Sequence, residues 1–265
     1  MPPEPADKMS APHSQPSASE IPSWPAHDRL GSLHAAELKT IHRFQQSFDF
    51  PWLMKRISDL GPSRFMMALI AFVLFCLDPR VGVRLGLLFF ASSAVRDLIA
   101  LALHSQRPYW LDTGVATFTD SPPVATSYGL PSGHAMVGTA VWLFLAAEVR
   151  RPWAWAAGTA IAVLICLSRV YLGMHFMSDV ALGFGLGALL VFFWRRLETP
   201  AAEALQRQTS RVIYLSALLV PVVILLAAGL IRIWLVSYPE AAPWAASAGK
   251  ARTLGVFAQN GGALF

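Results

Sequence analysis

Residues 152–194 read PWAWAAGTAIAVLICLSRVYLGMHFMSDVALGFGLGALLVFFW, which is two apolar runs, 152–171 and 176–194, that meet at a group of polar residues between Ser168 and Asp179. Each run is close to the roughly 20 apolar residues that a helix needs to cross the hydrocarbon core of a bilayer. The rest of the chain agrees, because 55% of its 265 residues are hydrophobic and only 14% are charged. An ordinary water-soluble domain carries about 25% charged residues. The sequence therefore predicts an all-α membrane protein.

Further apolar runs flank this pair on both sides. We expect spans at residues 64–77, 83–104, 135–149, 152–171, 176–194 and 212–236. Pro221 lies inside the last span and is expected to kink it. Residues 63–237 are therefore predicted to form one polytopic bundle of about six transmembrane helices.

The segments outside the bundle differ in composition. Residues 1–33 are rich in Pro and Ser, show no signal-peptide pattern and are expected to be a disordered tail. Residues 34–62 carry apolar side chains at three- to four-residue spacing, which predicts amphipathic helices at the membrane interface. Residues 238–265 are expected to be a tail or the start of a further apolar segment.

The charged residues exclude some partners and suggest an orientation. The net charge of +5 comes mostly from the ends of apolar runs rather than from one basic stripe, so we expect no nucleic-acid partner. One set of loops holds eight arginines, and the positive-inside rule makes that side cytoplasmic. These are Arg80, Arg84, Arg150, Arg151, Arg195, Arg196, Arg207 and Arg211. We expect a cell (inner) membrane protein whose loops at residues 105–133 and 172–175 face away from the cytoplasm.

Three polar clusters fall on that non-cytoplasmic side. The first is Arg107-Pro108 at the end of the second span, and the second is Ser132-Gly133-His134 before the third. The third cluster is Ser168-Arg169, followed by His175 and Asp179 at the start of the fifth span. Ionisable residues at membrane depth are costly and indicate a functional site.

The residue types in these clusters suit phosphate chemistry. Arg107 and Arg169 present planar forks of N–H donors that match phosphate oxygens two at a time. Ser132 and Gly133 precede a helix, whose free backbone N–H groups bind anions. Together they predict a phosphate-binding cradle.

The two histidines suit the chemical step. His175 and Asp179 are four residues apart at the start of a helix, so the carboxylate can hold the proton of one ring nitrogen and leave the other free. That nitrogen would act as nucleophile or base. His134 comes from a different loop and could give a proton to the leaving-group oxygen.

These motifs resemble the signature of the type 2 phosphatidic acid phosphatase superfamily, which includes glucose-6-phosphatases and vanadium haloperoxidases. The sequence Gln-Arg-Pro-Tyr-Trp around Arg107 is similar to the corresponding sequence in the glucose-6-phosphatase branch of this superfamily. The resemblance implies a metal-independent, acid-phosphatase-like hydrolase with no cofactor. It implies a phosphohistidine intermediate on His175, supported by Asp179, with His134 as general acid and the other cluster residues holding the phosphoryl oxygens.

One position departs from the family pattern. A lysine usually stands six residues before the Arg-Pro pair, and here that position is Ala100. Two residues could replace it, Arg96 one turn earlier and His104 one turn later. Helical side chains lean toward the N-terminus, so His104 is favoured by geometry, whereas Arg96 is favoured by charge.

The expected activity is hydrolysis of a phosphomonoester or diphosphate in the membrane. Lipid phosphates such as phosphatidate or a polyprenyl diphosphate are favoured as substrates, with a sugar phosphate as the alternative. Three rival functions stay open: a phosphotransferase using the same site, a catalytically silent protein that binds phosphate-bearing ligands, suggested by Ala100, and a haloperoxidase. The expected partners are the phosphorylated substrate and membrane lipids.

Overall fold

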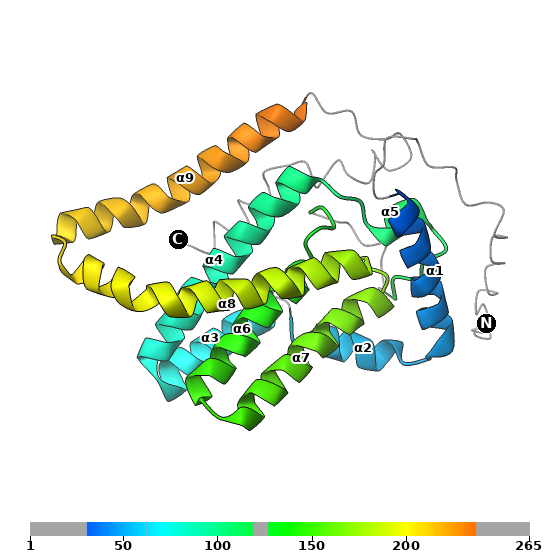
Figure 1. The fold of residues 1–265 in the computed structure, drawn as a ribbon, viewed down its shortest axis with the longest axis horizontal. Helices are drawn as coiled ribbons and strands as arrows, with labels where there is room; N and C mark the ends of the chain where they lie inside the picture. The colour runs from blue at the N-terminus through cyan, green and yellow to red at the C-terminus, as the bar shows by residue number, and fades with distance from the viewer. Residues whose placement is uncertain (1–30, 62, 119–126, 237–265) are drawn as a thin grey trace, which may run out of the picture.

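Proline and capping residues set several of the helix boundaries. The computed structural model describes residues 31–61, 63–118 and 127–236 (Figure 1). Helix α4 (Pro79–Leu103) begins at a proline, and the carboxylate of Asp78 caps it by accepting a hydrogen bond from the backbone N–H of Arg80 at 2.8 Å.

The described residues form helices and no strand, which confirms the all-α prediction. The other elements are α1 (Gly31–Ser47), α2 (Pro51–Ser58), α3 (Ser63–Phe72), the π-helical turn η1 (Val73–Leu77), α5 (Pro108–Leu111), α6 (Gly133–Val149), α7 (Pro152–Tyr171), α8 (Met177–Gln206) and α9 (Ser210–Val236).

Four stretches in the described part of the chain are long and apolar enough to cross a membrane. They are 79–111, which contains α4 and α5, then 152–171, 177–206 and 210–231. The two remaining predicted spans correspond to α3 with η1 and to α6, which are apolar but shorter. The chain is therefore a polytopic membrane helix bundle.

The helix bounds differ from the predicted ones mainly in α8. The sequence predicts that this span ends at residue 194, yet the helix continues to Gln206 and passes through Pro200. Arginine is a good helix former, so Arg195 and Arg196 end the apolar run without ending the helix. In Figure 1, α8 extends past the rest of the bundle and α9 runs back from its end. Helix α1 begins at Gly31, inside the tail predicted for residues 1–33, whereas residues 1–30 of that tail and the whole tail predicted for residues 238–265 lie outside the described residues.

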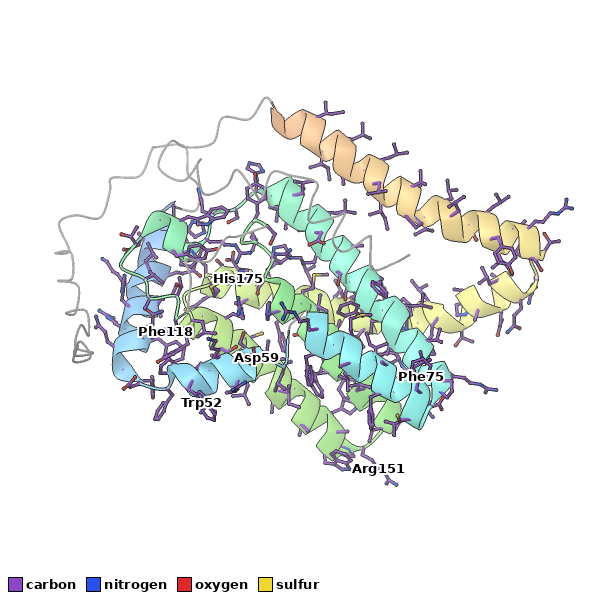
Figure 2. All side chains as sticks on the ribbon, turned by 180° about the vertical axis from the view of Figure 1, so that it is seen from behind. Trp52, Asp59, Phe75, Phe118, Arg151 and His175 are labelled. Carbon is purple, nitrogen blue, oxygen red and sulfur yellow. The ribbon has the colours of Figure 1, made fainter. Side chains whose placement is uncertain are left out.

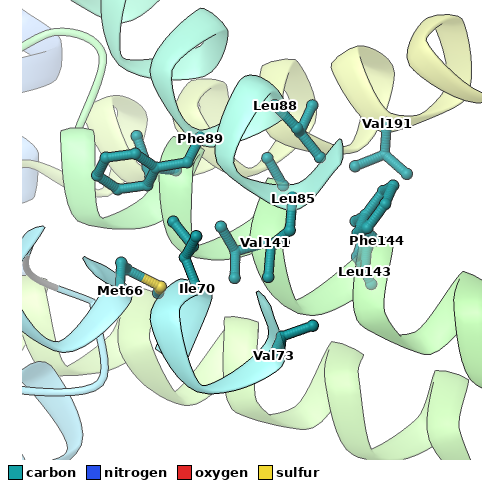
Figure 3. Close-up of a cluster of buried hydrophobic side chains, with 12 residues drawn as sticks. Met66, Ile70, Val73, Leu85, Leu88, Phe89, Val141, Leu143, Phe144 and Val191 are labelled. Atoms are coloured by element: carbon teal, nitrogen blue, oxygen red, sulfur yellow. The ribbon is translucent and has the colours of Figure 1, made fainter. Parts of the chain in front are cut away.

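Helix α6 occupies the centre of the bundle and is the most deeply buried helix. It packs against α4, α7 and α8. A cluster of apolar side chains fills the space between α3, α4, α6 and α8 (Figure 3). Its fully buried members include Met66, Leu85, Leu88 and Phe144. This core fixes the end of α6 that lies far from the polar clusters.

Glycines in α8 let its backbone touch that of α6. A Cβ atom at Gly187 would overlap the carbonyl oxygen of Met136, and one at Gly183 would lie 2.8 Å from the carbonyl oxygen of Ser132. Gly185 faces away from α6 and has nothing within 4 Å of its Cβ position. Small residues at such crossings allow close helix packing in membranes. The starts of α6 and α8, which carry polar clusters, are therefore held at a fixed separation.

A group of four charged residues ties the helices together at the opposite end. Arg84 of α4 donates to Glu148 of α6 at 3.0 Å and to Glu198 of α8 at 2.6 Å, and Arg195 also pairs with both carboxylates. Figure 2 shows Phe75 and Arg151 toward this end and His175 away from it. Arg84 and Arg195, which come from two of the predicted arginine-rich loops, thus lie at the same end of the bundle.

Helices α1 and α2 lie across the end of the bundle that carries the polar clusters. His42 of α1 contacts Asp112 at 2.8 Å, and Gln45 donates to the backbone oxygen of Tyr171 at 2.7 Å. Phe50, the N-cap residue of α2, and Trp52 in its first turn are exposed aromatic residues, and Trp52 points outward in Figure 2. Helices α1 and α2 therefore cover the bundle on one side, whereas the interfacial position predicted for residues 34–62 stays a prediction.

The glycine contact between α6 and α8 can be tested with a matched pair of variants. We expect Gly187→Ala to lower the free energy of unfolding by about 1–3 kcal/mol, because a methyl group there meets backbone that cannot move aside. Thermal unfolding of the detergent-solubilised protein measures the effect. Gly185→Ala makes the same change in the same helix and should be neutral or slightly stabilising. Equal destabilisation by both variants would contradict the contact.

Candidate active site

The three polar clusters of the sequence come together at one end of the bundle. Arg107 immediately precedes α5, Ser132 and Gly133 start α6, and Arg169 lies in the last turn of α7. His175 lies in the α7–α8 connection and Asp179 in the first turn of α8. All of these except Gly133 are buried, with His175 only 2% exposed. The structure thus brings the predicted site residues into one place.

Arg107 is held by protein acceptors on several sides. Its Nε donates to the backbone oxygen of Ser127 at 2.9 Å and its Nη2 to the Ser127 hydroxyl at 3.1 Å. Its Nη1 donates to the backbone oxygen of Met174 and lies 3.3 Å from Nε2 of His175. These bonds fix the guanidinium directly against the histidine ring.

The contacts of His175 indicate which ring nitrogen is free for chemistry. Nε2 faces a guanidinium N–H, which can only donate, so this nitrogen is the acceptor and carries no proton. The proton then lies on Nδ1, which is 3.5 Å from Oδ2 of Asp179, close enough for an electrostatic contact but longer than a hydrogen bond, and Nδ1 has no hydrogen-bond partner among the described residues. The geometry is that of an imidazole backed by a carboxylate, with an unprotonated Nε2.

The electrostatic surroundings also favour a neutral imidazole. Burial lowers the pKa of His175 well below its usual range, and the positive charges of Arg107 and Arg169 lower it further. Neutral imidazole is the nucleophilic form, so this environment keeps the ring reactive at neutral pH.

Asp179 links the third cluster to the second. Its Oδ2 accepts a hydrogen bond from the backbone N–H of Phe176 at 3.0 Å, which holds the carboxylate beside the histidine. Its backbone oxygen accepts from the N–H of Ser132 at 3.0 Å. A direct backbone bond therefore ties the start of α6 to the start of α8.

The N-terminus of α6 offers donors to an anion. Ser132 occupies the N-cap position but its side chain makes no capping bond, and its fully buried hydroxyl has no partner among the described residues. The first N–H groups of a helix also lack intrahelical acceptors. These groups supply one wall of the predicted cradle.

Arg96 and His104, the two candidate replacements for the usual lysine, occupy different places. The Arg96 guanidinium reaches the site: its Nε donates to the backbone oxygen of Pro131 at 3.2 Å and its Nη2 to the Ser127 hydroxyl at 3.0 Å. It lies so close under Gly133 that a Cβ there would be 3.2 Å from Nε. Ser127 thereby accepts hydrogen bonds from both Arg96 and Arg107.

His104 does not follow the expected helical geometry. Helix α4 ends at Leu103, and His104 is its C-cap with a left-handed φ of 37°. Its ring contacts the backbone oxygen of Ala102 and the edge of Tyr128. The lean of helical side chains therefore does not apply to it, whereas the length of the Arg96 side chain overcomes its unfavourable direction.

Several residues in contact with the site carry no signal in the sequence. The hydroxyl of Ser58 accepts from Nη1 of Arg169 at 2.7 Å, and a Cβ at Gly61 would lie 3.0 Å from the His134 ring. Glu37 accepts from the N–H of Ser178 at 2.7 Å, next to Asp179. Ser127 lies between two arginines. All four are small or polar residues in connecting or amphipathic segments, where only the tertiary structure shows their role.

The arrangement can hold a tetrahedral oxyanion beside an attacking imidazole. Arg96, Arg107 and Arg169 supply positive charge, and each is close enough to His175 for its charge to act on the ring. His134 acts on His175 in the same way and comes from a different element, so it can approach a bound group from another side. Within the described residues, no three His, Cys, Asp or Glu side chains are placed to hold a metal ion together.

The protonation of His175 can be measured directly. We expect its imidazole to stay neutral below pH 6.5, the ordinary midpoint, because burial and the arginines destabilise the charged form. An NMR titration of ¹³C-labelled histidine follows the ring signal, which His175→Asn assigns by its disappearance. Since the folded-state pKa is lowered, the neutral fraction should fall only at distinctly acidic pH. A midpoint at or above 6.5 would contradict the described burial.

Comparison with known proteins shows what this chain is similar to. The pattern of the PAP2 superfamily matches residues 81–203. The chain is 30% identical over 160 residues to phosphatidylglycerophosphatase B of Bacillus subtilis, covering 54% of this chain and 73% of that protein. It is 26% identical to glucose-6-phosphatase catalytic subunit 1 of Canis lupus familiaris, covering 66% of this chain but only 56% of that protein.

A solved structure shares the fold. The crystal structure of a transmembrane PAP2 type phosphatidylglycerolphosphate phosphatase from Bacillus subtilis superposes with a TM-score of 0.55 at 24% identity. The match covers 65% of this chain and 89% of that chain. The helical membrane fold predicted from the sequence is therefore confirmed.

Proposed function

Because this chain belongs to the PAP2 superfamily, we propose that it is an integral membrane phosphatase that works through a phosphohistidine on His175. The observation that carries this proposal is the contact of 3.3 Å between Nη1 of Arg107 and Nε2 of His175. It holds a phosphate-binding group and an unprotonated imidazole nitrogen side by side, where a phosphoryl group bound to the arginine meets the nucleophile.

The first chemical step transfers the phosphoryl group to the enzyme. Nε2 of His175 attacks phosphorus, and the bond between phosphorus and the leaving-group oxygen breaks. His134 gives a proton to that oxygen as it leaves, so the product departs as an alcohol or as a phosphate monoester. Asp179 stabilises the proton on Nδ1 and the positive charge that develops on the ring.

The second step returns the enzyme to its starting state. His134, now unprotonated, takes a proton from a water molecule, and the water oxygen attacks the phosphorus of the phosphohistidine. The P–N bond breaks, Nε2 recovers its electron pair, and inorganic phosphate is released. In both steps Arg96, Arg107, Arg169, the Ser132 hydroxyl and the start of α6 stabilise the charge on the equatorial oxygens.

A lipid phosphate is the proposed substrate class. The site lies at the ends of membrane-crossing helices, where a lipid headgroup can reach it while its chains stay in the bilayer. Phosphatidylglycerophosphatase B supports a lipid monoester by its name, and polyprenyl diphosphates fit the same chemistry. A sugar phosphate remains the alternative, supported by the similarity to glucose-6-phosphatase.

The proposal includes the membrane, the orientation and the absence of a metal requirement. The charged group at the far end of the bundle, with Arg84 and Arg195, supports a cytoplasmic position for that end and a non-cytoplasmic site. We place the protein in the cell (inner) membrane. Three arginines and a helix N-terminus supply the positive charge that a metal ion contributes in other phosphatases.

Hydrolysis and the covalent intermediate can be tested together. We expect the detergent-solubilised protein to release phosphate from phosphatidate, a polyprenyl diphosphate or glucose 6-phosphate in the presence of EDTA. With ³²P-labelled substrate and a rapid alkaline quench, wild type should retain acid-labile label on protein. His175→Ala should lose the label and at least about 10³-fold of the rate, since the nucleophile is gone. Equal rates in the two proteins would refute the assigned nucleophile.

Arg96 is the proposed replacement for the lysine that the family usually has at the position of Ala100. We expect Arg96→Ala to lower kcat/KM about 10- to 100-fold, because a charge-assisted hydrogen bond to the phosphoryl group contributes about 1.5–3 kcal/mol. His104→Ala, at the C-cap of the same helix and with its ring against the backbone oxygen of Ala102, is the matched control and should change kcat/KM less than threefold. The reverse order of effects would show that His104 replaces the lysine.

A further inference from the structure

Among the described residues, Arg169 donates fewer hydrogen bonds to the protein than the other two arginines of the site, Arg96 and Arg107. Its guanidinium is buried, with 8% of the residue exposed, yet among the described residues it has one hydrogen bond, from Nη1 to the hydroxyl of Ser58 at 2.7 Å. Its Nε is fully buried and has no partner in the same part of the structure. Arg107, by contrast, donates to Ser127, Tyr128 and Met174.

The position of the single bond on the guanidinium matters. Nη1 is the terminal nitrogen on the Cδ side. The hydrogen bond to Ser58 therefore leaves the opposite edge of the guanidinium, formed by Nε and Nη2, open to a ligand. The N–H bonds of that edge are parallel and match two oxygens of one phosphoryl group. Arg169 is close enough to Arg107, His134 and His175 for its charge to act on all three. The edge of Arg169 that can bind a ligand is therefore positioned by the hydrogen bond between Nη1 and the hydroxyl of Ser58, on the other side of the guanidinium.

From these contacts we infer that Ser58 of helix α2 is a positioning residue, which holds Arg169 so that its Nε–Nη2 edge binds the phosphoryl group. This rests on the proposed function of the site. Ser58 lies outside residues 81–203, which match the superfamily pattern, so α2 adds to the site from outside the motif-bearing region.

The end of α2 is well anchored for this purpose. Ser58 is 5% exposed, and its backbone oxygen accepts from the N–H of Gly61 at 3.0 Å. Gly61 in turn lies so close to His134 that a Cβ there would be 3.0 Å from Cδ2 of the ring. One turn of the chain thus contacts a residue of the second cluster and a residue of the third. Removing the Ser58 hydroxyl leaves a buried guanidinium free to rotate, and its edge no longer faces the ligand.

The test measures binding of orthovanadate, an analogue of the transferred phosphoryl group, to the full chain in detergent by isothermal titration calorimetry. We expect Ser58→Ala to raise the dissociation constant about tenfold, the effect of one charge-assisted hydrogen bond. Ser58→Thr keeps the hydroxyl and should stay within about twofold of wild type. Ser216→Ala removes a serine hydroxyl that bonds its own helix backbone in α9, and should leave the dissociation constant unchanged.

A double-mutant cycle shows whether Ser58 acts through Arg169. In an Arg169→Ala background, Ser58→Ala should change the dissociation constant less than twofold. An unchanged constant in Ser58→Ala alone, or the same tenfold loss without Arg169, would overturn the inference. A third result would also overturn the inference: Ser58→Ala lowers the thermal midpoint of the ligand-free protein but binds vanadate normally. Ser58 would then have a structural role only.

Two further results are decisive. If Ser58→Ala does not fold, Ser58→Cys, whose thiol is of similar size but a weak acceptor, gives the same comparison. If wild type binds no vanadate while Ser58→Ala folds normally, the phosphate site itself is refuted, and with it the proposed function. Normal wild-type binding with no effect of Ser58→Ala refutes the positioning role alone.

Discussion

Mutual repulsion among three buried guanidinium groups is the constraint around which the rest of the site is built. Arg96, Arg107 and Arg169 lie close together at one end of the bundle, where backbone oxygens and serine hydroxyls accept from them and Arg96 also pairs with the carboxylate of Asp97 at 2.7 Å. Such a cluster costs free energy unless an anion joins it. The apolar core and the close helix contacts of the bundle offset that free energy. The excess positive charge then attracts a phosphoryl group to the site.

The position of the nucleophile follows from the same packing. Gly183 and Gly187 bring the backbone of α8 against α6, and a backbone bond joins Ser132 to Asp179 where the two helices begin. The cradle and the carboxylate behind His175 therefore belong to one rigid unit. Arg107 completes it from the α4–α5 connection by touching the ring nitrogen that must attack. Each group is placed by a helix end, which explains why the three motifs can be far apart in the sequence.

Much of the fold and the core of the site could be predicted from the sequence, for identifiable reasons. Pro152 marks the start of α7, where the predicted span also begins, because proline favours the first turn of a helix. Asp78 and Pro79 begin α4 in the same way, although the predicted span started only at residue 83. The three polar clusters were identifiable because charge at membrane depth is rare. Tertiary contacts decide the rest. The continuation of α8 through Pro200, the left-handed turn at His104 and the hydroxyls of Ser58 and Ser127 depend on neighbours that no local pattern contains.

The length of α6 shows which helices of the bundle have to match the lipid. At about 1.5 Å per residue its 17 residues span roughly 25 Å, less than the ~30 Å hydrocarbon thickness of a typical bilayer. The cradle at one end and Glu148 at the other are polar, so both resist immersion in oil. Because α4, α7 and α8 pack around this short helix, its polar ends lie in protein rather than in lipid. A central helix can therefore be shorter than the bilayer is thick, since only the helices that face the lipid have to match its hydrocarbon core.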